Sequence, residues 1–161
     1  MTGARIRELR RDDGDLLDQV MAGLSDQSRY LRFHSPKPRL TASDRAFLTA
    51  VDDHDHLAVV ALGAGGAPLG IARCVRLRDD PTVADFAAEV VDVWQRRGLG
   101  SALLARLARR AAAAGIERLS ATVLAETGLQ RTLMRRGWRV TATAGPALTL
   151  EAPVWTLLRE A

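Results

Sequence analysis

The sequence is short of several residue types, and each shortage excludes a class of protein. Cys74 is the single cysteine among 161 residues, so no disulfide can form within the chain. Because no histidine or asparagine partner stands near it, we expect a buried core thiol and not a nucleophile. Lys37 is the only lysine, which removes the Gly-Lys-Ser/Thr sequence that a Walker nucleotide loop requires.

Aromatic residues and long apolar runs are also scarce. Aromatics make up 4% of the chain, which leaves little surface on which nucleic-acid bases could stack. The net charge is +4, but the positive charges are scattered among acids, so a nucleic-acid binder is the least favoured hypothesis. No apolar run reaches about 18 residues, and arginines and aspartates interrupt the N-terminal segment, which excludes a signal peptide. We therefore expect a soluble, cytoplasmic protein with no membrane partner.

A hydrophobic content of 47% in 161 residues is enough for one domain with its own core, spanning 1–161. The residue pattern predicts, in chain order, a strand at 6–10, helices at 16–24, 28–33 and 41–51, strands at 57–62, 69–77 and 85–91, a helix at 101–114, a strand at 116–124, a helix from 127 to 136, and strands at 139–143 and within 148–158. Asp12 and Thr41 are expected N-caps, and Thr127 with Gln130 a capping box. This order predicts an α/β fold with a mixed sheet that is mostly antiparallel and carries helices on both faces.

The most informative stretch is Ala84 to Arg110, where a buried strand passes through a tight turn into an amphipathic helix expected to begin near Ser101. The turn has the sequence Gln95-Arg96-Arg97-Gly98-Leu99-Gly100. Its two glycines allow backbone amides to approach a ligand without a Cβ in the way. Helix N-terminal amides and two adjacent arginines favour an anion, and a pyrophosphate is the expected occupant.

Other interpretations of this turn fit less well. A dinucleotide fingerprint needs a third glycine where this chain has Leu103, and the Walker loop fails for want of lysine. A further interpretation stays open, in which the turn is simply rich in arginine and its glycines serve packing alone. The remaining pattern, Gln-x-x-Gly-x-Gly between a strand and a helix, resembles the acetyl-CoA signature of the GNAT acetyltransferase superfamily.

The resemblance extends beyond the signature. The segment ADFAAEVVDVWQRRGLG is similar to that of bacterial protein-lysine acetyltransferases, and Ser28 to Phe33 resembles their helix near the substrate mouth. The order of elements is also that of GNAT proteins, which implies a sheet splayed between two central strands with acetyl-CoA in the gap. The resemblance implies that the pantetheine arm pairs with the backbone of Ala88, Glu89, Val90 and Val91. It implies that the pyrophosphate is held by the signature residues, Gln95, Arg96, Arg97, Gly98, Leu99, Gly100 and Ser101.

The implied activity is that of an acetyl-CoA-dependent N-acetyltransferase, which moves an acetyl group directly from the CoA thioester to a protein lysine or small-molecule amine. An alkyl ammonium has a pKa of about 10.4, so a base helps at neutral pH. Asp85 and Glu89 share one face of the predicted strand, and apolar neighbours can raise the pKa of either acid. Asp85 stands where the related enzymes carry the acid proposed as base. Pairing of both acids with arginines is the alternative.

Some features leave the activity open. Thr127 and Met134 stand where many GNAT enzymes carry an Asn and a Tyr that can protonate the thiolate. The alternative function is therefore a catalytically weak or silent GNAT-fold module that binds acyl-CoA and regulates. The run from Asp52 to His56 has metal-ligand residue types but not their helical spacing, so no metal is expected. The acceptor, the acyl-chain preference and the formation of a homodimer also stay open.

Overall fold

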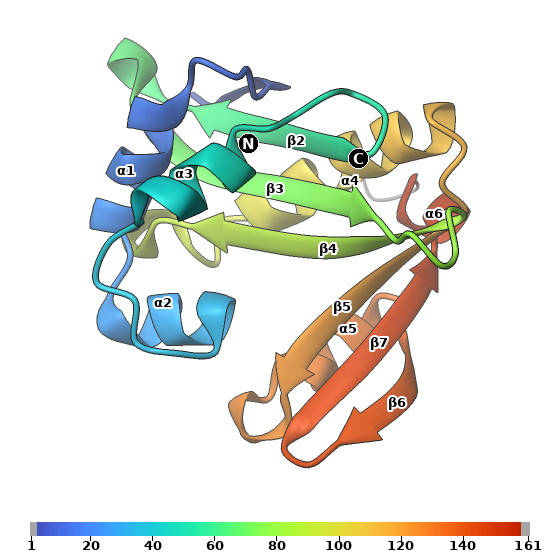
Figure 1. Ribbon diagram of the computed structural model, residues 1–161. Coiled ribbons are helices and arrows are strands. Elements are labelled where there is room, and N and C mark those ends of the chain that lie inside the picture. The colour runs from blue at the N-terminus through green and yellow to red at the C-terminus, as the bar shows by residue number, and fades with distance from the viewer. Residues whose placement is uncertain (1–2, 159–161) are drawn as a thin grey trace.

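The computed structural model describes residues 3–158, apart from the side chain of Glu126. Within these residues, seven strands form one sheet in the order β1-β2-β3-β4-β5-β7-β6. The strands are β1 (Arg5–Glu8), β2 (His56–Leu62), β3 (Pro68–Arg76), β4 (Val83–Val90), β5 (Arg118–Leu124), β6 (Arg139–Ala144) and β7 (Ala147–Pro153). The helices are α1 (Gly14–Ala22), α2 (Asp26–Phe33), α3 (Ala42–Leu48), α4 (Leu99–Ala113), α5 (Leu129–Arg135) and α6 (Val154–Leu157). The predicted fold class is confirmed (Figure 1).

Helices cover both faces of the sheet. In Figure 1, α1 and α3 lie in front of the sheet and α4 lies behind it. Helix α4 contacts β2 and β3 from its side, and α1 contacts β3 from the other. The first part of β3, residues 68–74, is consequently buried on both faces. Among residues 3–158, no helix combines the length and the apolarity that crossing a bilayer requires.

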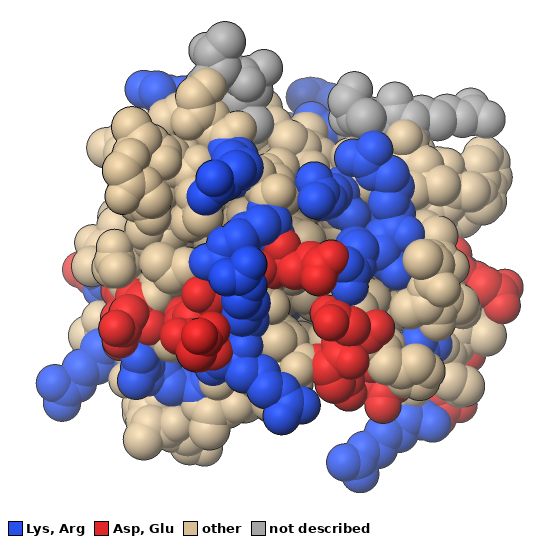
Figure 2. All heavy atoms as spheres, turned by 90° about the horizontal axis from the view of Figure 1, so that it is seen from above, with Lys and Arg blue, Asp and Glu red and all other residues tan. Residues whose placement is uncertain are grey.

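Basic and acidic side chains are mixed on the surface. Figure 2 shows arginines and acids interspersed over the upper face, with no region of a single charge sign there. Ion pairs of the chain include Arg7 with Asp13 at 2.8 Å and Arg110 with Asp53 at 3.1 Å. This arrangement agrees with the scattered charge expected from the sequence.

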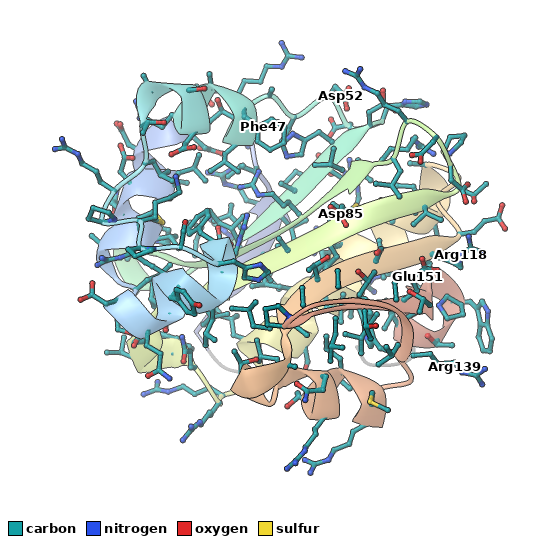
Figure 3. The ribbon with its side chains drawn as sticks, turned by 60° about the horizontal axis from the view of Figure 1, so that its bottom comes forward. Phe47, Asp52, Asp85, Arg118, Arg139 and Glu151 are labelled. Atoms are coloured by element: carbon teal, nitrogen blue, oxygen red, sulfur yellow. The ribbon has the colours of Figure 1, made fainter. Side chains whose placement is uncertain are left out.

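The sheet is split between β4 and β5. These two strands run parallel and pair at three positions, of which the last joins Asp85 to Ser120. Beyond this pair they diverge, and β5 continues as the partner of β7 (Figures 1 and 3). The predicted splay between two central strands is confirmed, and it places Asp85 at the point where the gap begins.

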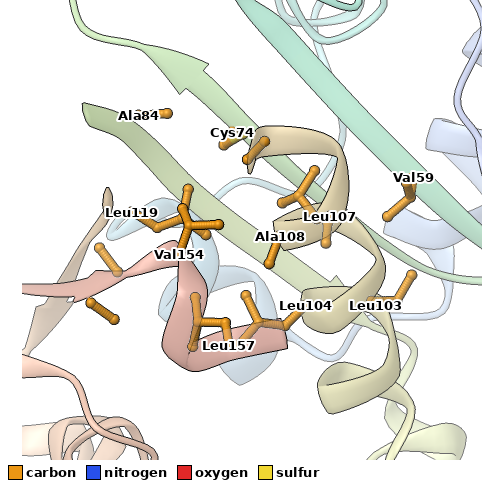
Figure 4. Close-up of a cluster of buried hydrophobic side chains, with 14 of the residues drawn as sticks. Val59, Cys74, Ala84, Leu103, Leu104, Leu107, Ala108, Leu119, Val154 and Leu157 are labelled. Carbon is orange, nitrogen blue, oxygen red and sulfur yellow. The ribbon is translucent and has the colours of Figure 1, made fainter. Parts of the chain in front are cut away.

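The larger of two hydrophobic clusters lies under α4. Leu103, Leu104 and Leu107 of this helix meet side chains from the strands and from α6, including Leu157 (Figure 4). Cys74 belongs to the same cluster and is fully buried, and burial raises the pKa of its thiol to about 12. The expectation of a core thiol is therefore confirmed.

Two helix starts differ from the prediction. Helix α4 begins at Leu99 and not near Ser101, because Gly98 adopts a left-handed φ of 82° as its N-cap. Asp13, and not Asp12, occupies the N-cap of α1. Its carboxylate accepts from the Arg10 amide at 2.7 Å and pairs with an arginine of β1, so it stabilises the chain before the helix.

The C-terminal segment also departs from the prediction. The capping box expected at α5 does not form, because the Thr127 hydroxyl donates to the Leu124 carbonyl at 2.7 Å and Gly128 takes the N-cap position. The last predicted strand, placed within 148–158, is β7, and residues 154–157 form α6, which the sequence did not predict. A single helical turn is too short to show an apolar periodicity of its own.

Candidate active site

The turn between β4 and α4 forms a concave run of backbone amides. Arg96 and Gly98 have φ values of 63° and 82°, both in the left-handed region. A left-handed conformation is costly for arginine, and such strain is concentrated at sites that hold ligands. The first backbone bond of α4 runs from the Ala102 amide to the Gly98 carbonyl at 3.1 Å. The amides of Leu99, Gly100 and Ser101 thus have no acceptor within the helix, which is the usual basis of an anion site.

A cavity of about 430 Å³ extends from this turn along β4 towards α5. Its turn end is polar, with Arg96, Gly98, Gly100 and Ser101 in the wall, and the remainder is mostly apolar. A Cβ added at Gly100 would meet no protein atom within 4 Å, so the space beside this backbone is free for a ligand. An anionic end and an apolar channel fit a pyrophosphate that carries a pantetheine arm.

The other signature residues contribute differently. Gln95 lines the same cavity, and its side-chain amide donates to the Val90 carbonyl at 2.9 Å. The Arg97 guanidinium lies 4.9 Å from the centre of the Trp94 ring, and the Leu99 side chain is buried in the core. For Arg97 and Leu99 it is therefore the backbone amide that is available to an anion.

Backbone alternation decides which groups of β4 face the gap. The Val91 amide donates to Leu69 of β3 at 2.9 Å, and its carbonyl accepts from Trp94 at 2.9 Å. Both polar groups of Val91 are thus already bonded. Since a strand directs successive residues to opposite edges, Glu89 also faces β3, whereas Ala88 and Val90 face the gap. Of the four residues expected to pair with a cofactor arm, these two alternate ones have the right orientation.

Asp85 lies at the narrow end of the gap (Figure 3). Its side chain reaches solvent, and within the described part of the chain it has no hydrogen bond or ion pair. The neighbouring strands nevertheless remove part of its hydration, and this desolvation raises the pKa of the carboxyl group. The next two residues, Phe86 and Ala87, line a smaller cavity of about 190 Å³ between β4 and β5. Asp85 is thus a carboxylate without a partner among the described residues, and it precedes in sequence the residues that line this cavity.

Glu89 lies on the same face of β4 but in other surroundings. Its side chain is 7% exposed, and one carboxylate oxygen accepts from Arg32 Nε of α2 at 2.8 Å. Arg73 is buried on the neighbouring strand, where desolvation lowers the pKa of its guanidinium to about 10 although the charge of Glu89 opposes this change. The pairing with arginine that was considered for both acids is found for Glu89.

Ser28 and Arg32 were expected near the substrate mouth, but sequence analysis missed their partners and a second pair, Arg73 with His56. Arg32 and Ser28 of α2 bond to β4 and to the signature turn, and their partners are 57 and 67 positions away along the chain. Arg73 lies 2.9 Å from His56 Nε2, and burial, with this positive charge beside it, lowers the pKa of His56 to about 4. No local pattern connects such distant positions.

The run from Asp52 to His56 forms a turn. One oxygen of Asp52 accepts from the backbone amides of His54, Asp55 and His56 at 2.8 to 3.0 Å, which lowers the pKa of Asp52 to about 2. The carboxylate thus stabilises the loop before β2. Among residues 3–158, no group of three or more His, Cys, Asp or Glu side chains is arranged to hold a metal ion.

Comparison with known proteins agrees with this geometry. The sequence matches the acetyltransferase (GNAT) family over residues 19–138. Acetyltransferase Pat of Mycolicibacterium smegmatis is 35% identical over 113 residues, which are 70% of this chain and 34% of that protein. The chain therefore spans about a third of this relative's length.

Solved structures show the same fold. The crystal structure of the GNAT domain of S. lividans PAT is 31% identical, with a TM-score of 0.87 over 93% of this chain and 90% of that one. A phosphinothricin acetyltransferase from Sinorhizobium meliloti, in complex with AcCoA, has a TM-score of 0.76 at 17% identity, over 94% of this chain and 89% of that one. The family match covers most of the sequence, so the chain belongs to the acetyltransferase (GNAT) family.

Proposed function

We propose that this protein transfers an acetyl group from acetyl-CoA directly to an amine, either a protein lysine or a small-molecule amine, and that Asp85 is the base. The observation that carries the proposal is the position of Asp85. Among the described residues it is an unpaired carboxylate with a raised pKa, at the point where β4 and β5 diverge. The residues that follow it on β4 line two cavities, one of which reaches the glycine-containing turn at the start of α4.

The signature turn holds the coenzyme in this proposal. The amides between Arg96 and Ser101 receive the pyrophosphate, and the Arg96 side chain adds a positive charge. The backbone groups of Ala88 and Val90 face the gap and pair with the pantetheine arm. The coenzyme supplies the activated acetyl group, and a relative of the same fold is described in complex with AcCoA.

Asp85 prepares the acceptor. An alkyl ammonium with a pKa of about 10.4 must lose a proton before its nitrogen can attack. Asp85 accepts this proton directly or through water, and desolvation brings the pKa of its carboxyl closer to that of the ammonium. The amine nitrogen then attacks the thioester carbonyl: the C–N bond forms, the C–S bond breaks and CoA leaves as thiolate, while the nitrogen releases its second proton to this thiolate or to water. A thiol pKa of about 8.5 makes this thiolate an adequate leaving group without the tyrosine that Met134 replaces.

Glu89 is the weaker candidate for the base. Its carboxylate is bonded to Arg32 at 2.8 Å, and both side chains are largely shielded from water. A proton taken up by Glu89 would break this pair and leave the arginine charge uncompensated. The single buried cysteine is compatible with a reducing compartment, and we place the reaction in the cytoplasm.

Two measurements test the proposal. Calorimetry with CoA and acetyl-CoA measures binding, and thiol release measures turnover on a panel that contains a lysine peptide, propylamine and a diamine. We expect binding of both coenzymes and turnover with at least one amine. The absence of heat at millimolar CoA would reject the proposal, whereas binding without turnover on a broad panel would favour the silent regulatory module.

A further inference from the structure

Helix α2 is attached to the rest of the molecule mainly by polar contacts. None of its eight residues is buried. Figure 1 shows the helix beside the C-terminal half of β4, on the open side of the gap. A helix without a buried apolar face has little hydrophobic stabilisation of its own position, so its side-chain hydrogen bonds decide where it lies.

Three contacts, made by the helix and its N-cap residue, reach β4, the segment after it and the signature turn. The Ser25 amide, at the helix N-cap, donates to Asp92 at 3.0 Å. The Ser28 hydroxyl accepts from the Gln95 side chain at 3.2 Å, and Arg32 pairs with Glu89 at 2.8 Å. The three α2 positions are three and four residues apart, so they lie on one side of the helix. We call these contacts the α2 latch.

The latch connects the two ends of the proposed site. Gln95 lines the coenzyme cavity and also bonds to Val90, whose carbonyl faces the gap. Arg32 lines both the cavity between β4 and β5 and a neighbouring cavity of about 260 Å³ that includes Glu89 and Gln95. A ligand that fixes the conformation of the signature turn therefore also fixes Gln95, the partner of Ser28. This contact in turn fixes the position of α2, which carries Arg32.

We propose that Arg32 is a positioning residue, and that the α2 latch transmits occupation of the coenzyme site to the wall of the acceptor passage. This inference rests on the proposed function. When the signature turn holds CoA, Gln95 and Glu89 keep α2 against β4 and so fix the passage through which the amine reaches Asp85. Arg32 acts through Glu89 and does not touch the reacting atoms.

The test is hydrogen–deuterium exchange of residues 26–33, measured with and without CoA, combined with calorimetric CoA binding. The variants are Arg32→Met, which removes the charge and the donor, and Arg32→Lys, which keeps the charge beside Glu89. Arg109→Met, on the exposed side of α4, is the matched control. In the wild type and in Arg109→Met, we expect CoA to slow exchange of α2 by about tenfold, which corresponds to about 1.4 kcal/mol.

In Arg32→Met, we expect CoA still to bind with an affinity within about threefold of the wild type, a change below 1 kcal/mol, while its protection of α2 is lost. Arg32→Lys should restore at least part of the protection, which a role in general stability would not predict. If CoA binds but leaves α2 exchange unchanged in the wild type, or if Arg32→Met responds like the wild type, the inference is wrong and the proposed function stands. If the wild type does not bind CoA, the proposed function fails first.

Discussion

Asp85 and Glu89 share one face of β4, and their surroundings give them different tasks. Asp85 has no partner in the described part of the chain, and desolvation raises its pKa. Glu89 is buried and bonded to Arg32. An unpaired carboxylate can accept a proton without breaking another interaction, whereas a paired one stabilises its neighbour.

The first prediction concerns Asp85→Asn. We expect kcat/KM for the amine to fall by about 10²- to 10⁴-fold, because the amide cannot accept a proton. Affinity for acetyl-CoA, measured by calorimetry, should stay within about twofold, a change of less than 0.5 kcal/mol. The wild-type rate should fall as pH decreases through the raised pKa of Asp85, since only the ionised form is a base, and this acid limb should disappear in the variant.

Asp79→Asn is a matched control, because this exposed acid belongs to the loop between β3 and β4. It should keep both the rate and the acid limb. An unchanged rate and pH profile in Asp85→Asn would remove Asp85 from the mechanism and return Glu89 as a candidate.

The second prediction concerns His56, whose pKa is lowered to about 4 by burial and by Arg73. In the unfolded chain, a histidine takes up a proton near pH 6.5, whereas the folded protein resists protonation down to about pH 4. The free energy of unfolding should therefore be highest above pH 6.5 and fall, by at most about 3 kcal/mol, as the pH decreases through this window.

Urea unfolding at pH 7, 5.5 and 4.5 measures this effect. His56→Gln does not titrate and keeps an acceptor near Arg73, so the loss of stability over this range should shrink. His54→Gln, at an exposed histidine, should keep the wild-type slope. An unchanged slope in His56→Gln would show that other groups cause the acid sensitivity.

Single residues differed in how well the sequence predicted them. Asp85 could be proposed as the base from the sequence because its strand and its place before the signature are local features. The roles of Arg32 and Arg73 were missed, because their partners come from other elements and are set by the register of the sheet. A sequence pattern reports neighbours along a strand or a helix, and it does not report which side chain another element brings close.

At the scale of elements, the proposed anion site coincides with the first turn of α4. Gly100 lies in the first turn, and the space where its Cβ would be is open. Gly70 of β3 is the opposite case, because a Cβ there would lie 2.9 Å from the Glu89 carbonyl and 3.1 Å from Leu103. We therefore expect Gly100 to be required for ligand binding and Gly70 to be required for packing.

The third prediction compares Gly100→Ala with Gly70→Ala. Gly100→Ala should leave the melting temperature unchanged or slightly higher, since alanine favours a helix, and should weaken CoA binding by about tenfold or more because the methyl group fills the ligand space. Gly70→Ala should lower stability by about 1–3 kcal/mol through overpacking. Thermal unfolding and calorimetry measure both effects. Full CoA affinity in Gly100→Ala would place the anion elsewhere.

The types and order of the elements were predicted correctly, because apolar periodicity and turn residues indicate each of them locally. Element ends were less accurate. Asp13 replaced Asp12 as N-cap, and Thr127 bonded backwards to Leu124, since several residues nearby compete for the same backbone groups. The short final helix α6 was not predicted, because four residues are too few to show a helical periodicity.

At the scale of the whole molecule, the cavity proposed for the coenzyme lies where α5 faces β4 and the start of α4. Its walls come from β4, from the signature turn and from α5. A ligand bound there contacts segments that are separate in the sequence and stabilises their arrangement. The gap itself was expected from the resemblance, but its starting point at Asp85 depends on where the β4–β5 pairing stops.

The fourth prediction is that acetyl-CoA raises the melting temperature. At a concentration 100 times Kd, a ligand that binds only the folded state adds about 2.7 kcal/mol, which corresponds to about 5–10 °C for a protein of this size. Thermal unfolding with and without acetyl-CoA tests this, and Gly100→Ala at the same concentration is the control. No shift in the wild type would contradict a coenzyme site in the folded protein.

The short contact between β4 and β5 also bears on how the chain folds. Strands β2, β3 and β4 pair in chain order through short connections. Strand β1 pairs with β2 across three helices, and β5 pairs with β4 only after α4 has crossed over. Pairings that close long loops are expected late in folding. The gap between β4 and β5 should thus form last. A chain that stops folding before this step would expose two unpaired strand edges, with which other newly synthesised chains could pair.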